Sequence, residues 1–368
     1  MTSRVALVSP YALSVFGGVQ EQVLAMSREL TQRGLEVLVV APDASDRSVY
    51  DTKAIVERFG KRLSLPANGS RAPLTLSARA SRAARAAVLD FAPDVVHFHE
   101  PFAPLLGWST LRAHAAPSVA TFHRNGPGPA LSWGAPLLRR LARGVDVASA
   151  VSASAAMTIR RATGIEATVL FNGFETDRFV ASARERAGDV TLVCVGRLEE
   201  RKGVSVAIDA VRIHNARGAD QWRLVVIGDG PERARLEARA GHDPLVVFVG
   251  AVPDDVKRGW LRRANALIAP ALRGESFGLT LLEAMASETM VVASDIVGYR
   301  EAAGTHAVLF EPGDALCLEH AIVRAIDDED ASRVAGARDY AEHWSMKRLV
   351  DAYLVLYEDA ASRFKPAR

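Results

Sequence analysis

Short, continuous apolar runs alternate with amphipathic segments along most of the chain. Apolar strands that alternate with helices are typical of a parallel sheet covered by helices on both faces. The sequence therefore predicts an α/β fold. In the first half we expect strands over 4–9, 35–41, 94–98, 118–122, 145–152 and 167–171, and helices over 18–33 and 77–91.

The same alternation starts again after a polar stretch at 175–189. There we expect strands over 190–195, 224–227, 245–249, 266–269, 290–293 and 307–310, and a helix over 204–216. Two such halves predict two Rossmann-like domains, 1–180 and 181–344, that face a cleft. A last amphipathic helix, about 345–368, is expected to pack back on the first domain. Ligands of open parallel sheets bind beyond the carboxyl ends of the strands.

Length and composition fit this organisation. A chain of 368 residues, 49% hydrophobic and 24% charged, can bury two cores. Its start forms a strand rather than a secretory signal, and no apolar run is long enough to span a bilayer, so we expect a cytoplasmic protein. Cys194 and Cys317 lie within apolar patterns and are expected to be reduced core thiols.

Charge is distributed unevenly around a net value of +2. Residues 1–180 hold 20 Lys and Arg against 14 Asp and Glu, which gives +6, and the remainder gives −4. A basic first half favours an anionic partner.

The stretch 269–286 predicts a strand, a glycine-flanked turn and a helix. Such a junction directs unpaired N–H groups and the positive end of a helix at the turn, which suits a phosphate. Glu275 lies in the turn and Glu283 stands about two helical turns later on the same side. Their spacing indicates a site for a ligand with both phosphate and hydroxyl groups.

Other motifs also fall at expected strand ends. Arg197 follows one strand and Lys202 opens the next helix, a pair of cations that suits a pyrophosphate. The pair Gly17-Gly18 opens a helix and either allows close approach of a ligand or forms a plain tight turn. Gly228-Asp229-Gly230-Pro231 is interpreted first as a structural turn.

Two histidine features deserve separate interpretations. His97 and His99 share one face of a strand, but no further cluster completes a metal site by spacing, so no bound metal is expected. His123 ends a strand that needs no polar group and is a candidate for the cleft.

Elsewhere, Arg79, Arg82 and Arg85 recur every three residues on a helix that could lie on an anionic membrane surface.

One rival hypothesis uses the same turn differently. Residues 274–278 match Gly-x-Ser-x-Gly, the nucleophile turn of α/β-hydrolases. Ser276 would then be the nucleophile of a serine esterase, with Asp295 as the acid. The base would be one of three later histidines, His306, His320 or His343. This hypothesis leaves the first 180 residues without a role. A non-catalytic binder of nucleotide sugars or lipids is a further alternative, against which the intact charged motifs argue.

The motifs together resemble those of retaining glycosyltransferases of family 4, which have the two-domain GT-B fold. The resemblance covers nearly the whole chain, and the Glu275-x7-Glu283 element is its most specific part. Further matches are Phe16-Gly17-Gly18-Val19, His99-Glu100-Pro101, Thr121-Phe122-His123, Asn172-Gly173, Gly196-Arg197 with Arg201-Lys202-Gly203, and Gly228-Asp229-Gly230-Pro231. Within family 4, five segments are most similar to those of actinobacterial phosphatidylinositol mannosyltransferases: Pro10-Tyr11, 17–20, 66–70, 97–101 and 274–278.

The resemblance implies a donor site in the second domain and an acceptor site in the first. It assigns ribose binding to Glu283, pyrophosphate binding to Arg197 and Lys202, and hexose binding to Glu275. It implies further donor contacts from Gly17, Gly18, Ser276, Phe277, Gly278 and Leu279, and acceptor contacts from Tyr11, Gln20, Asn68 and His123. His123 is also expected to orient the reacting sugar.

The implied partners are a nucleotide sugar, expected to be GDP-mannose, and an anionic phospholipid at the inner membrane face. No cofactor, divalent metal or nucleic acid is expected, and the sequence carries no sign of the oligomeric state. Residues 71–76 and 124–129 depart from the family pattern on the acceptor side. A family 4 enzyme with another donor and acceptor is therefore the alternative.

Overall fold

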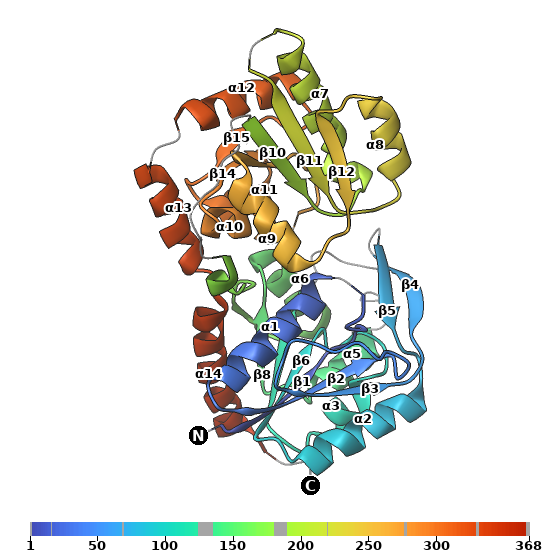
Figure 1. Cartoon of the computed structure of the whole chain (residues 1–368). Coiled ribbons are helices and arrows are strands. Elements are labelled where there is room, and N and C mark those ends of the chain that lie inside the picture. The colour runs from blue at the N-terminus through green and yellow to red at the C-terminus, as the bar shows by residue number, and fades with distance from the viewer. Residues whose placement is uncertain are drawn as a thin grey trace. The chain divides into compact units, whose positions relative to one another are not determined.

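The computed structural model places the chain in two compact units (Figure 1). Unit 1 comprises Met1–Gly173 and Met346–Arg368, and unit 2 comprises Phe174–Ser345. The first boundary therefore falls before residue 174 rather than after residue 180. The structure describes residues 2–15, 17–67, 70–123, 135–179, 190–218, 220–275, 278–328 and 331–365.

Unit 1 is built on a seven-stranded parallel sheet of order β3-β2-β1-β6-β7-β8-β9. Its strands are β1 (Arg4–Val8), β2 (Glu36–Pro42), β3 (Ile55–Phe59), β6 (Val95–His99), β7 (Ser118–Phe122), β8 (Val147–Ala150) and β9 (Thr168–Val169). Its helices are α1 (Gly18–Gln32), α2 (Ala78–Phe91), α3 (Trp108–Ala113), α5 (Ala135–Ala142), α6 (Ala153–Thr163) and α14 (Met346–Arg363).

Alternate residues of β1 show how both faces of this sheet are covered. Val5 and Leu7 pack into a cluster with α1 and α14, whereas Ala6 and Val8 join a second cluster with α2, α3 and α5. Both faces are thus apolar, which explains the continuous apolar runs in the sequence. The C-terminal helix α14 belongs to unit 1, as expected for a helix at about 345–368 that packs back on the first domain.

The sequence did not predict three strands of unit 1. The edge strand β3 pairs with β2, and β4 (Leu63–Ala67) and β5 (Ser70–Leu74) form an antiparallel hairpin. Every side chain of β3 keeps some exposure, so this strand lacks the continuous apolar run by which the central strands were found.

Unit 2 contains a six-stranded parallel sheet of order β12-β11-β10-β13-β14-β15. Its strands are β10 (Val190–Val195), β11 (Trp222–Ile227), β12 (Val246–Gly250), β13 (Ala266–Ala269), β14 (Met290–Ser294) and β15 (Val308–Phe310). Its helices are α7 (Val204–Asn215), α8 (Arg233–Ala240), α9 (Asp254–Arg263), α10 (Leu279–Ala286), α11 (Val297–Ala303), α12 (Ala315–Asp327) and α13 (Ala331–Glu342), with 3₁₀ helices η1 (Thr176–Phe179) and η2 (Glu200–Lys202).

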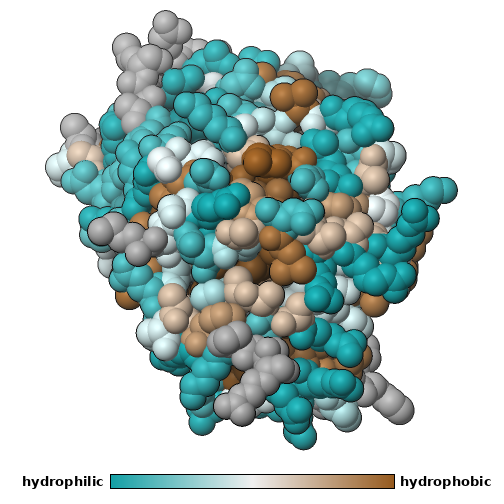
Figure 2. Space-filling view, turned by 90° about the horizontal axis from the view of Figure 1, so that it is seen from below, coloured by the Kyte–Doolittle hydropathy of each residue, from teal (hydrophilic) through white to brown (hydrophobic). Residues whose placement is uncertain are grey.

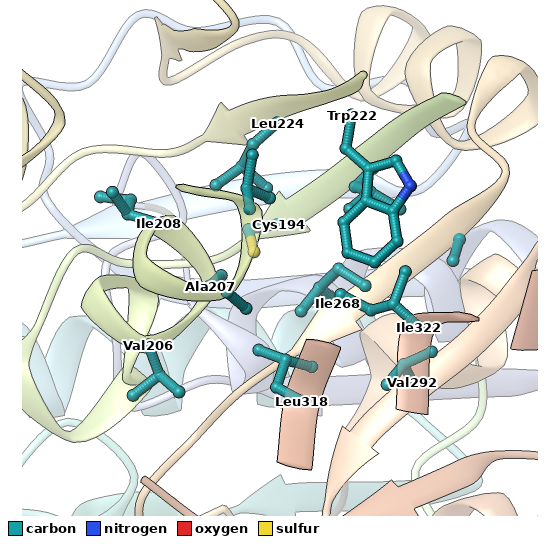
Figure 3. Close-up of a cluster of buried hydrophobic side chains, with 14 of the residues drawn as sticks. Cys194, Val206, Ala207, Ile208, Trp222, Leu224, Ile268, Val292, Leu318 and Ile322 are labelled. Atoms are coloured by element: carbon teal, nitrogen blue, oxygen red, sulfur yellow. The ribbon is translucent and has the colours of Figure 1, made fainter. Parts of the chain in front are cut away.

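One core cluster of unit 2 lies between the sheet and helices α7 and α12 (Figure 3). Cys194 of β10 points into this core beside Ala207 of α7, and burial raises the pKa of its thiol to about 12. Cys194 is therefore the expected core thiol. The expectation was wrong for Cys317, which is exposed at the start of α12. There the side chain of Asp314 caps the helix by accepting the N–H groups of Leu316 and Cys317.

Among the helices that the structure describes, none combines the length and the apolar character needed to cross a bilayer.

Candidate active site

Glycines bring two loops of unit 2 together at the carboxyl ends of β10 and β11. The N–H of Gly196 donates to the carbonyl of Ile227 at 3.0 Å, and that of Leu198 donates to Asp229 at 3.0 Å. A Cβ atom on Gly228 would lie 1.9 Å from the carbonyl oxygen of Gly196. Only glycine fits this contact, so the structural interpretation of the 228–231 turn is confirmed.

A third loop, which follows β13, joins them through η2. Gly203 has φ +64°, and a Cβ there would lie 2.0 Å from the carbonyl oxygen of Pro270. The N–H of Leu272 donates to the carbonyl of Arg201 at 2.8 Å. The segment that carries Arg201 and Lys202 is therefore fixed against the loop that carries Glu275.

This arrangement places Glu275 between two cations. Its Oε1 lies 2.6 Å from Nζ of Lys202 and 2.7 Å from a guanidinium nitrogen of Arg201. Arg201 also pairs with Glu199 at 2.8 Å, and Arg197 approaches Glu199 at 3.3 Å. The structure thus brings Lys202 and Glu275 together and gives Arg197 a different partner. Arg201 and Glu199 had no assigned role, although Arg201 stands in a motif quoted above.

Opposing charges in this cluster suit a ligand with both phosphate and hydroxyl groups. Lys and Arg side chains held by carboxylates can exchange those partners for phosphate oxygens, and a carboxylate can then accept sugar hydroxyls. Burial would lower the pKa of Arg201, but Glu275 and Glu199 raise it above the usual value. The guanidinium therefore stays charged.

Helix α10 begins beside this cluster. Gly278, the residue just before the helix, is buried with φ +74°, and a Cβ there would lie 2.8 Å from the ring of Tyr299. Leu279 opens the helix, so its first N–H groups lack partners within the helix. Ser276 and Phe277 lie outside the described residues. The predicted phosphate contacts of this turn stay predictions.

Glu283 lies further along α10 and is 8% exposed. Its Oε1 lies 2.9 Å from Nζ of Lys257 in α9, which also pairs with Asp254 at 2.8 Å. Burial would lower the pKa of Lys257, but Glu283 and Asp254 raise it above its usual value. Ribose binding by Glu283 stays a prediction, and Lys257 is a neighbour that the sequence did not indicate.

In unit 1 the loop after β1 leads to the predicted glycine pair. Gly17 has an extended backbone and precedes α1, which Gly18 opens. A Cβ on Gly17 would lie 2.6 Å from Oε1 of Gln20, whereas Gly18 faces open space. Gln20 is buried and donates from Nε2 to the carbonyl of Val15 at 3.0 Å. This hydrogen bond of Gln20 therefore stabilises the loop.

The acceptor residues are only partly described. Tyr11 is half-buried, and its N–H donates to Oγ of Ser9 at 3.2 Å. Asn68 lies outside the described residues, as does the segment 124–134. Acceptor contacts by Tyr11, Gln20 and Asn68 stay predictions.

Three histidine rings stack at the carboxyl ends of β6 and β7. Ring centroids of His97 and His99 lie 4.5 Å apart, and those of His99 and His123 lie 5.3 Å apart. Nδ1 of His99 is 3.0 Å from Nε2 of His123, whose backbone N–H donates to Glu100 at 2.5 Å. Burial lowers the pKa of His97 to about 3 and that of His123 to about 4. Neutral imidazoles are therefore the resting state.

Hydroxyl groups from α14 complete the buried polar network. Tyr357 Oη lies 2.8 Å from Nδ1 of His97, and Thr121 Oγ1 lies 2.7 Å from its Nε2. Tyr353 Oη reaches Thr121 at 2.9 Å. Both nitrogens of His97 thus have protein partners. Within the described residues, no group of three or more His, Cys, Asp or Glu side chains could hold a metal ion.

The residues of the esterase hypothesis have other partners. Asp295 forms an ion pair with Arg300, and the ring of His306 stacks on Tyr340. His320 approaches Glu319 at 3.5 Å, and His343 Nδ1 approaches the carbonyl oxygen of Asp339 at 3.0 Å. The described part of the chain shows no acid–histidine pair that includes Asp295.

Comparison with known proteins identifies the fold and the family. Residues 16–178 match the model described as Glycosyltransferase Family 4, and residues 189–328 match Glycosyl transferases group 1. Sucrose-phosphate synthase of Thermosynechococcus elongatus superposes with a TM-score of 0.78 at 19% identity, covering 98% of this chain and 99% of that one. HepE of Anabaena, solved in complex with UDP-glucose, superposes with a TM-score of 0.71 at 18% identity, covering 96% and 99%. The fold is therefore GT-B, with two Rossmann-like parallel-sheet domains.

Closer relatives match over nearly the full length of both chains. The phosphatidyl-myo-inositol mannosyltransferase of Mycobacterium leprae is 32% identical over 98% of this chain and 97% of its own length. That of Mycolicibacterium smegmatis is 33% identical over 96% and 93%. These matches identify a glycosyltransferase and set the esterase hypothesis aside. The chain belongs to glycosyltransferase family 4, among the relatives of the phosphatidyl-myo-inositol mannosyltransferases.

Proposed function

We propose that this protein transfers mannose from GDP-mannose to the inositol of phosphatidylinositol with retention of anomeric configuration. The observation that carries the proposal is the match of about one-third identity over nearly the full length of the mannosyltransferases. The charged cluster around Glu275 supports it, because it holds the cations and carboxylates that a nucleoside diphosphate sugar needs.

In this proposal unit 2 binds the donor. Lys202 and Arg197 bind the pyrophosphate, and the N-terminus of α10 binds the phosphate nearest the sugar. Glu275, freed from Lys202 by that phosphate, accepts hydroxyl groups of the hexose. Arg201 is added to the predicted set because it pairs with Glu275 at 2.7 Å. Glu283 binds the ribose.

The proposed reaction needs no enzymatic nucleophile. An inositol hydroxyl oxygen forms the new bond to the anomeric carbon while the bond from that carbon to the phosphate oxygen breaks. The electron pair leaves on GDP, and the phosphate takes the proton of the hydroxyl. Cations around the pyrophosphate stabilise the charge that develops there. His123 orients the hexose as a neutral group.

We further propose that unit 1 binds the anionic surface of a membrane through α2, as a peripheral protein on the inner face. Arg79, Arg82 and Arg85 are exposed on this helix, whose opposite face is buried. Arg85 also borders a cavity of about 240 Å³ between α2 and α3 that Val88 and Leu111 help to line. In Figure 2 apolar side chains gather near the centre of this side of the molecule and hydrophilic ones surround them. Arginines beside an apolar hollow suit phospholipid.

Donor binding and transfer test the proposal separately. GDP-mannose should raise the melting temperature more than GDP-glucose, UDP-glucose or ADP-glucose. Mannose should then pass to phosphatidylinositol in vesicles. Replacing Glu275 by Gln should abolish transfer without loss of folding, while the matched change of exposed Glu301 to Gln should not. Selective stabilisation by a different nucleotide sugar would favour the alternative of another family 4 activity.

The membrane proposal has its own measurement. Exchanging Arg79, Arg82 and Arg85 for Gln should weaken binding to vesicles rich in anionic lipid, and high salt should weaken wild-type binding. A control with the same change of charge replaces the exposed Arg223, Arg235 and Arg324 of unit 2. Equal binding by both variants would count against a role for α2.

A further inference from the structure

The two ring nitrogens of His99 have different surroundings. Nδ1 lies 3.0 Å from Nε2 of His123, within hydrogen-bonding distance. Nε2 is buried, and among the described residues it has no hydrogen-bond partner. The whole side chain is 2% exposed.

This asymmetry decides where the hydrogen of His99 sits. Burial lowers the pKa of His99 well below its usual value, so the ring is neutral and carries one N–H. A buried N–H without an acceptor is rarer in proteins than an acceptor without a donor. The hydrogen therefore belongs on Nδ1, which donates it to Nε2 of His123.

The tautomer of His123 follows from that hydrogen bond. Its Nε2 accepts, so the neutral ring carries its own hydrogen on Nδ1. Burial lowers the pKa of His123, and a hydrogen bond with the side chain of Asn172 opposes this shift. Asn172 is therefore the group that accepts a hydrogen bond from Nδ1–H of His123 while no ligand is bound. The hydrogen bond from the backbone of His123 to Glu100 fixes the residue at its other end.

We propose that His99 is a positioning residue that holds His123 as the Nδ1–H tautomer, so that His123 offers a hydrogen-bond donor, not an acceptor or a base, to an oxygen of the hexose. Histidine free in water prefers the opposite tautomer, so the protein must impose this one. Only the identity of the sugar ligand rests on the proposed function. The tautomer itself is a property of unit 1 alone.

Nitrogen-15 NMR of histidine-labelled protein tests the tautomer without any substrate. The spectrum of the wild type should show a protonated Nδ1 and an unprotonated Nε2 for His123. The His123 signals are assigned by their loss in the His123→Asn variant. A protonated Nε2 at His123 would overturn the proposal, whether or not the protein transfers mannose.

A pair of variants separates positioning from packing. The amide of Asn places an N–H close to the position of the imidazole Nδ1, whereas the longer Gln places it near Nε2. His99→Asn should keep the His123 tautomer and most of kcat. His99→Gln should lose the tautomer and lower kcat at least tenfold with little change in the KM for the sugar nucleotide. Equal kcat and the same His123 spectrum in both variants would contradict the proposal.

Discussion

The stacked histidines make unit 1 sensitive to mild acid. His97 and His99 are almost fully buried and neutral in the folded state, and both pKa values lie below the usual 6.5. The unfolded chain takes up a proton on each as the pH falls below that value, so it binds more protons than the folded chain. The free energy of unfolding is thus unaffected by these histidines well above pH 6.5. It declines as the pH falls from there toward the pKa values of the folded state.

The expected loss is large for a unit of this size. Between pH 7.5 and 5.5 each fully buried histidine costs about 1.4 kcal/mol, so the two together cost about 3 kcal/mol of the free energy of unfolding. His123, which stays partly exposed, adds to this loss in the same direction. Carboxylates contribute little in this interval, because those with shifted pKa values, such as Asp46 and Asp94, have them lowered.

The stability of each unit can be measured separately by urea unfolding at the two pH values, followed by a pulse of hydrogen exchange at one common pH. Peptides from β6 and β7 should report a marked loss of stability at pH 5.5. Peptides from β10 and β11 should report less, since every described histidine of unit 2 keeps some exposure, including half-buried His306, whose pKa burial lowers. His97→Asn should remove about half of the loss. Equal shifts in both units would refute the reasoning.

Three further outcomes are expected. Changing Lys257 to Met should destabilise unit 2 by about 3–5 kcal/mol, because Glu283 stays buried without its cation, and adding Glu283→Gln should restore part of this in thermal melts. Gly228→Ala should prevent stable folding of unit 2, whereas Gly218→Ala, also at positive φ but in open space, should cost only about 1–2 kcal/mol in urea titrations. The pKa of His123 is lowered to about 4, so the pH profile of kcat should show no titration near pH 6.5 from this residue. A titration near pH 6.5 that is present in the wild type and absent in His123→Asn would prove this wrong.

The central strands were predictable because they are buried on both faces. The expected strand 190–195 is β10 and the expected strand 266–269 is β13, residue for residue. The edge strand β3 was missed for the opposite reason, since its side chains keep some exposure on both faces and charged Glu57 and Arg58 therefore fit into it. A continuous apolar run indicates that both faces of a segment are buried. It does not by itself indicate that the segment is a strand.

Strand ends were a sound guide to the charged cluster around Glu275 but not to its ion pairs. Arg197, Lys202 and Glu275 follow neighbouring strands of one sheet, so the sequence could place them near one another. Which cation meets which carboxylate depends on the η2 turn and its glycine contacts, which no periodicity reveals. Arg201, to which the sequence assigned no role, therefore lies beside Glu275, whereas Arg197 pairs with Glu199.

The network between α14 and the histidines could have been inferred from two mismatches in the sequence. Tyr353 and Tyr357 fall on the apolar stripe of the last helix, and buried phenol groups need hydrogen-bond partners. His97 and Thr121 stand inside strands whose neighbours are apolar, so they need partners as well. Each set is unfavourable alone, and each supplies the hydrogen-bond partners of the other. This explains why the C-terminal helix belongs to unit 1 although all of unit 2 intervenes in the sequence. A polar residue within an apolar pattern thus indicates a contact that the pattern itself cannot locate.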